Sequence, residues 1–247
     1  MDVIELRNFY FSPLGQMARR MIRRQLRVLW GNVTGLDVVA MGYATPFVRP
    51  FRDEARRTIA LMPAAQGVVH WPEEGASLAA LVSETELPLP DASIDRLLLV
   101  HGLEHADTAR ALLREIWRVL APEGRLLVVV PHRRSPWAAR ENTPFGYGHA
   151  YSASQLSVLL TDCLFAPGRP QGALFFPPFG LNFFIRTAGW WERVGRVLWP
   201  GLGGVLLLEA TKRIYAAVPP RAGKRLLVPA TAGVRLEPSA KVTSTLR

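Results

Sequence analysis

The stretch that decides the fold is residues 87–131, LPLPDASIDRLLLVHGLEHADTARALLREIWRVLAPEGRLLVVVP. Residues 93–100 and 125–130 contain long apolar runs, which are typical of strands buried on both faces of a parallel sheet. Between them, residues 109–120 repeat apolar side chains at helical spacing and end at a Pro-Glu-Gly turn. We therefore expect strand, helix and strand, the repeating unit of an α/β sheet.

The same alternation continues on both sides of this stretch. Short apolar runs predict further strands at 36–41, 58–62, 174–176 and 203–216, and helical spacing predicts helices at 14–30, 153–161 and 182–199, with another capped by Thr45 and starting at Pro46. We expect the final strand to pair with 174–176 as a hairpin. The predicted fold class is α/β, with a mostly parallel seven-stranded sheet, helices on both faces and a C-terminal antiparallel strand.

Composition supports one folded body and limits its chemistry. Of 247 residues, 49% are hydrophobic, which is enough apolar surface for a core. The single cysteine, Cys163, excludes an internal disulfide framework, and a cytoplasmic location is the default expectation. We find neither a signal-peptide pattern nor an uncharged apolar run long enough for a transmembrane segment.

The formal charge of +10 is concentrated at the two ends of the chain. Residues 1–27 carry six arginines against two acids, and residues 219–247 carry six basic residues against one acid, so the segment between them is nearly neutral. We divide the chain into an N-terminal basic amphipathic helix (1–35), a main domain (36–218) and a disordered basic tail (219–247). The basic ends suggest contact with RNA or an anionic surface.

Residues 87–131 also carry a resemblance to a known family. They resemble the central region of class I S-adenosylmethionine-dependent methyltransferases, with matches at Leu87-Pro88, Asp91, Ser93-Ile94-Asp95, Glu104-His105, Arg114-Glu115, Arg118-Val119-Leu120, Pro122 and Gly124. The order of elements over residues 30–216 fits that family as well. The resemblance implies a Rossmann-like class I methyltransferase fold, with S-adenosylmethionine as the cofactor.

The first strand-to-helix turn departs from the family pattern. The family has an acid at the end of the first strand and then three alternating glycines, so that the backbone can approach the cofactor. Here the candidate cofactor-binding residues of this turn are Ala40, Met41, Gly42, Tyr43 and Ala44. Only the central glycine is kept, and Val38 stands at the acid position unless a one-residue shift lets Asp37 serve.

The end of the second strand departs in the same way. A carboxylate there would accept hydrogen bonds from the ribose hydroxyls, but the aligned residues are Met62 and Pro63. Loss of such an acceptor costs roughly 1–3 kcal/mol. Ser83 and Glu84, just before Leu87, occupy the region that faces the adenine in the family.

His101 follows the fourth expected strand, where the resemblance places the methyl acceptor. A neutral imidazole there is a candidate general base, and the alternative is a histidine that lines the cofactor pocket or caps a turn. His101, Glu104 and His105 also match the H-x-x-E-H pattern of zinc peptidases, but that pattern requires a helix and Gly102 interrupts it. We expect no metal.

Residues 131–151 follow the fifth expected strand and belong over the mouth of the site. Arg133, Arg134, His149 and Tyr151 are candidates for binding an anionic substrate, and the alternative is an ordinary solvated loop. We also expect Trp190, Trp191 and Trp199 to be buried over one face of the sheet rather than exposed in a lid or an interfacial helix.

The predicted function is methyl transfer from S-adenosylmethionine to an acceptor that the sequence does not identify, chiefly by positioning of the two reactants. The rival interpretation is a catalytically inactive, methyltransferase-like binding or scaffolding protein. The degenerate turn and Met62 favour the rival, whereas the intact 87–131 stretch favours the enzyme. Oligomeric state is not predicted.

Overall fold

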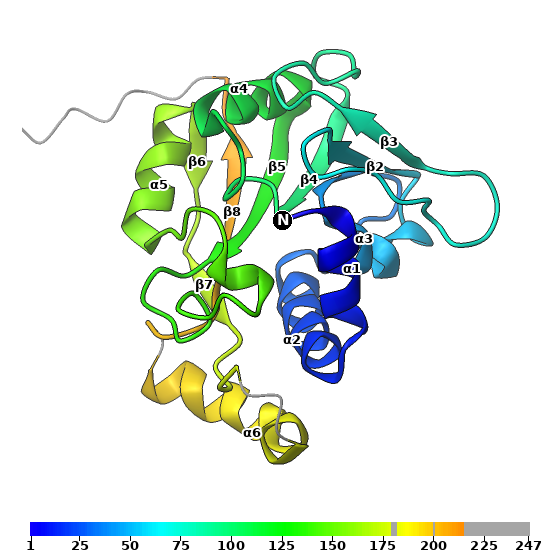
Figure 1. The fold of residues 1–247 in the computed structure, drawn as a ribbon. Coiled ribbons are helices and arrows are strands. Elements are labelled where there is room, and N and C mark those ends of the chain that lie inside the picture. The colour runs from blue at the N-terminus through cyan, green and yellow to red at the C-terminus, as the bar shows by residue number, and fades with distance from the viewer. Residues whose placement is uncertain (179–181, 200, 215–247) are drawn as a thin grey trace, which may run out of the picture. The chain divides into compact units, whose positions relative to one another are not determined.

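The computed structural model describes residues 1–178, 182–199 and 201–214, and Figure 1 shows the ribbon. Its helices are α1 (Val3–Phe11), α2 (Pro13–Leu29), α3 (Thr45–Arg52), α4 (Ala109–Val119), η1 (Pro144–Gly146, a 3-10 turn), α5 (Ala153–Asp162) and α6 (Asn182–Leu198). Its strands are β1 (Asp37–Gly42), β2 (Arg57–Pro63), β3 (Ala79–Val82), β4 (Ile94–Val100), β5 (Leu120–Pro131), β6 (Phe165–Pro167), β7 (Gln171–Ala173) and β8 (Val205–Lys212).

All eight strands belong to one sheet, in the order β3-β2-β1-β4-β5-β8-β6, with β7 also paired to β8. Strands β1 to β5 are parallel, whereas β8 runs antiparallel to β5, β6 and β7. After β1 the chain builds outward through β2 and β3, and then returns to place β4 on the other side of β1. Strand order therefore reverses between β1 and β4, and open α/β sheets bind ligands beyond the carboxyl ends of the strands at such a point.

Successive residues of the central strands enter two different apolar layers. In β1, Val38 and Ala40 belong to one core cluster, whereas Val39 and Met41 belong to the other. The first cluster contains side chains of α1, α2, α3 and α6, and the second contains side chains of α4 and α5. Because strand side chains alternate in direction, these all-apolar strands are covered by helices on both faces.

Helices α1 and α2 form a tight pair beside α3 (Figure 1). Helix α1 starts with a capping box in which Asp2 accepts from the backbone N–H of Glu5 at 2.9 Å and the Glu5 carboxylate accepts from the N–H of Asp2 at 3.2 Å. Ser12 ends α1 and caps α2, since its hydroxyl accepts from the N–H of Gly15 at 3.1 Å. A Cβ at Gly15 would lie 1.9 Å from the carbonyl oxygen of Phe9, so only glycine lets the helices meet this closely.

The predicted fold class is confirmed, and the differences are local. The sheet has one strand more than predicted, and the hairpin partner of the final strand is β7, three residues earlier than expected. Thr45 does not cap the helix after β1: the N-cap is Ala44, which has no side-chain acceptor, and Thr45 is already helical. The segment 1–35, expected to hold one basic amphipathic helix, contains two helices, and α1 was not predicted separately.

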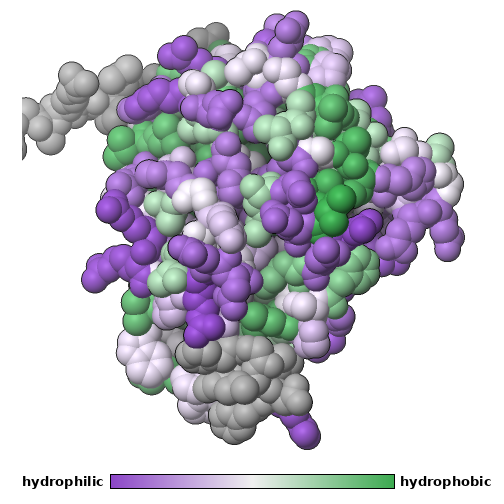
Figure 2. All heavy atoms as spheres, viewed as in Figure 1, coloured by the Kyte–Doolittle hydropathy of each residue, from purple (hydrophilic) through white to green (hydrophobic). Residues whose placement is uncertain are grey.

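The predicted basic tail, 219–247, lies outside the described residues, and the division of the chain into three parts stays a prediction. Within the described part, α1 and α2 share a core cluster with the sheet. No helix in that part is long and apolar enough to cross a bilayer. Figure 2 shows one face of the molecule, on which hydrophilic residues are interspersed with smaller hydrophobic patches.

Candidate active site

The candidate site lies at the carboxyl ends of β1, β2 and β4, and Gly42 at the end of β1 is its tightest point. Gly42 has φ +74°, in the left-handed region that favours glycine. A Cβ at this position would lie 2.3 Å from the carbonyl oxygen of Val100 at the end of β4. The surviving glycine of the degenerate turn is therefore required by the close approach of two strands.

His101 follows β4 directly and is held by hydrogen bonds on every side. Its Nε2 lies 2.7 Å from the hydroxyl of Tyr10 on α1, and its Nδ1 lies 3.0 Å from Oε1 of Glu104. The side-chain amide of Gln66 donates to its carbonyl oxygen. Because an ionised carboxylate only accepts hydrogen bonds, a neutral His101 carries its proton on Nδ1 and accepts a hydrogen bond from the Tyr10 hydroxyl at Nε2. Tyr10, His101 and Glu104 thus form a buried hydrogen-bonded chain.

Aromatic rings enclose this chain. The Tyr10 ring stacks on Tyr43 with centroids 5.8 Å apart and meets the edge of Phe47 at 5.3 Å. Phe145, in η1, lies 5.4 Å from the His101 ring. Burial raises the pKa of the Tyr10 hydroxyl well above its ordinary value, and the neighbouring Glu104 carboxylate adds to the effect. Because His101 is only 1% exposed, a ligand can contact its ring only if a covering side chain moves.

Two buried polar atoms next to His101 have no partner among the described residues: Oε2 of Glu104 and Nε2 of His105. The backbone around them is fixed, since the N–H of His149 donates to the carbonyl oxygen of Glu104 at 2.8 Å. Burial lowers the pKa of His105, which favours the neutral imidazole. Buried polar atoms normally have partners, so these two mark the place where a bound molecule would supply them.

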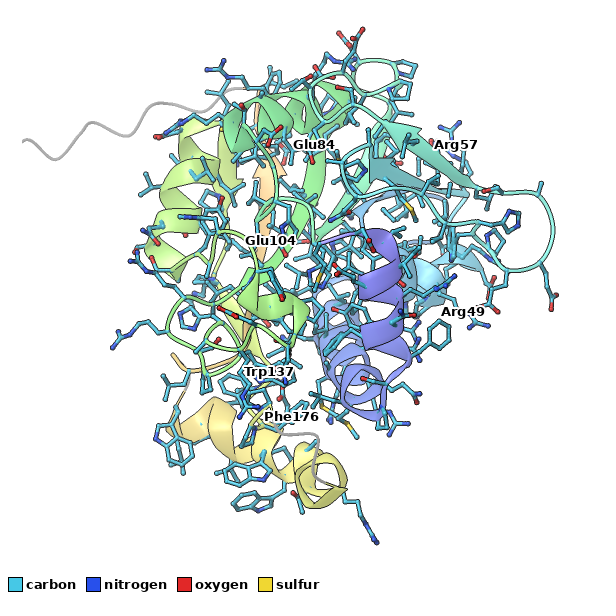
Figure 3. The ribbon with its side chains drawn as sticks, viewed as in Figure 1. Arg49, Arg57, Glu84, Glu104, Trp137 and Phe176 are labelled. Atoms are coloured by element: carbon cyan, nitrogen blue, oxygen red, sulfur yellow. The ribbon has the colours of Figure 1, made fainter. Side chains whose placement is uncertain are left out.

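A cavity of about 830 Å³ adjoins the buried chain on the α1 side. It is formed by α1, α2, Tyr43 in the turn after β1, α3 and the segment after β2. Its lining comprises Val3, Ile4, Arg7, Asn8, Tyr10, Phe11, Arg19, Arg23, Tyr43, Thr45, Pro46, Arg49, Val68, Val69, His70, Trp71 and Glu73. The Tyr10 ring separates this cavity from His101, and Figure 3 shows Arg49 beside α1 and Glu104 near the centre of the view. A cavity of this size accommodates a small-molecule ligand.

The structure brings most of the predicted cofactor-binding residues together but leaves few of them open to the cavity. Ala40, Met41, Gly42, Ala44, Met62, Pro63 and His101 are buried at the ends of β1, β2 and β4, and Tyr43 alone among the predicted set lines the cavity. Ser83 and Glu84 lie apart from it, in the turn after β3. The pKa of Glu84 is raised by burial and by Asp107.

Asp37 cannot serve as the acid of the first turn. It lies at the amino end of β1, opposite the site, where its carboxylate accepts from Arg56 at 2.7 Å and from Arg57 at 2.9 Å. These guanidinium groups hold its pKa below the ordinary value. The alternative of a one-residue shift is therefore wrong.

The four substrate-loop candidates lie outside the cavity lining. Arg133, Arg134 and His149 are exposed, whereas Tyr151 is buried and meets the His149 ring edge at 4.7 Å. The part of this loop that reaches the site is Phe145, which sequence reasoning missed. No cluster of three or more potential metal ligands occurs among the residues that the structure describes.

The family-like residues of α4 have a structural role. Arg118 donates to the carbonyl oxygens of Leu87 at 3.0 Å and Leu89 at 2.9 Å, and it pairs with Asp91 and Glu115. Glu115 in turn accepts from the N–H of Leu87 at 3.0 Å. These contacts fasten the segment before β4 to α4.

A second cavity, of about 510 Å³, lies between the loop after β5 and α6. Trp137 and Phe176 meet there edge to face at 5.2 Å, and Figure 3 shows them side by side. The prediction for the three tryptophans in and just after α6 was wrong in part. Trp190 is 53% exposed and Trp199 is 48% exposed, whereas Trp191 packs against the core from a partly buried position. The stripe that α6 buries instead includes Ala188 and Glu192.

A known protein family matches the part of the chain that builds this site. Residues 20–128, from α2 into β5, match the family model described as a methyltransferase domain. This segment contains the carboxyl ends of β1, β2 and β4, where the candidate site lies. Over these residues the chain is similar to that methyltransferase-domain family, and its sheet has the predicted Rossmann-like fold.

Two curated relatives come from Mycobacterium tuberculosis, one from strain H37Rv and one from strain CDC 1551, and both are named probable S-adenosylmethionine-dependent methyltransferases. Each is 37% identical to this chain over 82 residues. The match spans 32% of this chain and 30% of each relative.

Solved structures agree on the fold. A possible histamine N-methyltransferase of Thermotoga maritima superimposes with a TM-score of 0.59 and 18% identity, covering 85% of this chain and 96% of that one. A 1,6-didemethyltoxoflavin-N1-methyltransferase of Burkholderia thailandensis was solved with 1,6-didemethyltoxoflavin and S-adenosylhomocysteine. It superimposes with a TM-score of 0.51 and 20% identity, and the match covers 79% of this chain and 78% of that one. At these identities the likeness establishes the fold alone.

The residues present fit an S-adenosylmethionine site in part. Gly42 lets the end of β1 lie close to the end of β4, which places Tyr43 at the cavity, and the Glu104 Oε2 is an acceptor with no donor among the described residues. At the end of β2, however, Met62 replaces the ribose-binding carboxylate, and its sulfur accepts from the N–H of Val69 at 3.4 Å. Cofactor binding would therefore depend on the first turn and the cavity rather than on β2.

Proposed function

We propose that this protein transfers a methyl group from S-adenosylmethionine to a small acceptor at the junction of β1 and β4. The observation that carries the proposal is the methyltransferase-domain match over the very residues that build this junction. Tyr43 and Gly42 of the first turn would hold the cofactor beside the cavity, which has room for an acceptor. When bound, S-adenosylmethionine supplies an electrophilic methyl group.

The chain's own contribution is positioning and proton handling. Tyr10 closes the site over His101, and Glu104 fixes the ring so that Nε2 is the free acceptor. When Tyr10 moves aside, Nε2 can take the proton from an acceptor hydroxyl or amine, and the Glu104 carboxylate stabilises the resulting imidazolium. The Phe145 ring still covers His101 in this step and limits the access of water.

Calorimetric titration of the full chain with S-adenosylmethionine and S-adenosylhomocysteine tests the proposal. We expect both to bind, and Tyr43→Ala to weaken binding by at least about tenfold, or 1.4 kcal/mol, because Tyr43 lines the cavity at the first turn. Tyr147→Ala is the matched control, since Tyr147 is exposed in a loop away from that turn. Absence of heat and of a thermal shift at millimolar ligand would overturn the proposal.

The basic ends support a separate proposal about partners. We propose that residues 219–247, together with the arginines of α2, contact RNA or an anionic surface in the cytosol. Deleting 219–247 should weaken such binding and flatten its dependence on salt concentration, because fewer counterions are released. Unchanged affinity for both RNA and anionic vesicles after the deletion would rule the tail out.

A further inference from the structure

Three helices direct arginines into the 830 Å³ cavity. Arg7 comes from α1, Arg19 and Arg23 from α2, and Arg49 from α3. Glu73 is the sole acid among the described residues of the lining. The cavity wall is therefore strongly positive, and three of its four arginines belong to the basic N-terminal segment, residues 1–27.

None of these four arginines forms an ion pair with a carboxylate of the described residues. Several arginines elsewhere in that part of the chain do, for example Arg27 with Glu54, Arg52 with Asp53, Arg110 with Asp162 and Arg125 with Glu209. Of the four, Arg23 is anchored by donating from Nε to the carbonyl oxygen of Pro46 at 2.5 Å. The positive charge in the cavity is thus left uncompensated by the described part of the protein.

The arginines are close enough to oppose one another. Burial lowers the pKa of Arg23 to about 10, with the charges of Arg19 and Arg49 contributing to the decrease. Arg19 and Arg23 are also four residues apart on α2, a spacing at which like charges are unfavourable. An anion bound in the cavity would reduce the repulsion between these arginines and form charge-assisted hydrogen bonds with them, so its binding there is favourable.

The other residues of the lining indicate which chemical groups the rest of the ligand carries. Tyr10, Tyr43 and Trp71 present aromatic surface, and Val69 adds an apolar contact. The first turn of α3 also lines the cavity, and its N-cap Ala44 leaves the positive helix end without a side-chain acceptor. Guanidinium groups match phosphate in geometry and in charge. A cluster of several guanidinium groups is better matched by a phosphate dianion than by one carboxylate, which carries a single charge.

We propose that this cavity binds a phosphate ester that carries an apolar or aromatic group, and that this compound is the methyl acceptor. The second clause rests on the proposed function, whereas the anion site does not. Tyr10 links the two, since its ring lines the cavity while its hydroxyl bonds to His101.

Calorimetry of the full chain with inorganic phosphate and with phenyl phosphate tests the anion site without any cofactor. We expect phenyl phosphate to bind more tightly than phosphate, and Arg19→Ala and Arg49→Ala each to weaken its binding at least tenfold. Arg52→Ala is the matched control, because Arg52 lies on α3 beside Arg49 but pairs with Asp53 at 3.4 Å outside the cavity. Equal affinity in all three variants would overturn the proposal, since the anion would then bind elsewhere, for example on the basic tail.

Repeating the titration with saturating S-adenosylhomocysteine separates the anion site from the cofactor site. We expect phenyl phosphate still to bind, as an acceptor must do beside the cofactor. If S-adenosylhomocysteine displaces it and Arg19→Ala weakens both ligands equally, the arginines hold the carboxylate of the cofactor and the proposal fails. If S-adenosylhomocysteine does not bind at all while phenyl phosphate does, the proposed function fails and the anion site stands.

Phosphate esters occur both free and as lipid headgroups, so a third arm uses a lipid. Binding of short-chain phosphatidic acid in solution, competed by phenyl phosphate, would assign a lipid to the cavity. Binding of phenyl phosphate with no competition by phosphatidic acid would assign a free phosphate ester. In either case Arg49→Ala should reduce the signal, and a signal that Arg49→Ala leaves intact contradicts the cavity as its source.

Discussion

His101 stands in a backbone conformation that side chains rarely adopt, with φ +52°. The hydrogen bonds from Gln66 to its carbonyl oxygen and from Tyr10 to its ring hold it there. Residues kept in such conformations gather at functional sites, where the surrounding structure offsets the strain. The strain therefore supports a role for His101 that goes beyond filling the core.

Replacing Tyr10 with phenylalanine removes the hydroxyl and leaves Nε2 of His101 buried without a partner. We expect Tyr10→Phe to lower the free energy of unfolding by about 1–3 kcal/mol, the usual cost of an unsatisfied buried group. Tyr43→Phe is the control, because the Tyr43 hydroxyl has no hydrogen bond to the described residues, and it should change stability by less than about 0.5 kcal/mol. Chemical denaturation measures both, and equal losses would show that the Tyr10 hydroxyl is not specifically bonded.

Some residues of the site could be predicted from the sequence, and others could not. His101 and the first turn stand at strand ends, and strand ends can be recognised from apolar runs. Tyr10, Phe145 and the cavity arginines could not be assigned to the site, because three helices and a loop far apart in sequence bring them together. Glu104 was visible in the Glu-His motif, but its bond to His101 depends on the tight turn between them.

Among the helices, α1 shapes the site most, and the sequence analysis did not separate it from the helix that follows. A signal was present: Asp2 and Glu5 have capping-box spacing, and Val3, Leu6 and Tyr10 repeat at helical intervals. The helix is short, and such helices depend on tertiary packing rather than on propensity. The strands and α4 were predictable because their apolar periodicity is long and uninterrupted.

The contact between α1 and α2 depends on Gly15. We expect Gly15→Ala to destabilise the protein by about 1–3 kcal/mol, because its Cβ would meet the Phe9 carbonyl oxygen at 1.9 Å and force the helices apart. Gly189→Ala in α6 is the control, since its Cβ would meet nothing within 4 Å among the described residues, and it should stabilise by about 0.5–1 kcal/mol through helix propensity. Thermal unfolding distinguishes the two, and a neutral Gly15→Ala would contradict the close contact.

Helix α4 fastens the segment before β4 through one residue, Arg118. We expect Arg118→Ala to cost about 2–3 kcal/mol, because it deprives the carbonyl oxygens of Leu87 and Leu89 of a charged donor. Arg114→Ala, on the exposed face of the same helix, should change stability by less than about 0.5 kcal/mol. Hydrogen exchange should show faster exchange at Leu87 in the first variant only, since its N–H bonds to Glu115, which Arg118 orients.

For the whole molecule, the position of the charges matters more than their sum. The formal charge of +10 describes the two ends of the sequence, whereas ion pairs such as Asp37 with Arg56 compensate much of the body. Among the described residues, the cavity brings together four arginines that lack carboxylate partners there, three of them from the basic N-terminal segment. A uniform basic surface would bind anions everywhere, but this distribution predicts one specific anion site and separate, salt-sensitive contacts at the ends.

Two histidines give the free energy of unfolding a definite dependence on pH near neutrality. Burial lowers the pKa values of His105 and His132 in the folded state, so the unfolded chain, with histidine pKa values of about 6.5, binds protons more readily. Their contribution is therefore lost as pH falls below about 6.5 and proceeds toward the lowered pKa values. Glu84 and Glu192, whose pKa values are raised by burial, act in the opposite direction, so variants are needed to isolate the histidines.

We expect the double variant His105→Asn/His132→Asn to lose less stability than the wild type between about pH 7.5 and pH 5.5, a window that spans the unfolded histidine pKa, whatever its absolute stability. Urea denaturation at several pH values within this window measures the two slopes. His70→Asn is the control, because His70 is exposed and its removal should leave the wild-type slope unchanged. If the double variant keeps the wild-type slope, these histidines are not buried in their neutral form, and the packing of the loop over Glu104 and His105 must differ from the one described.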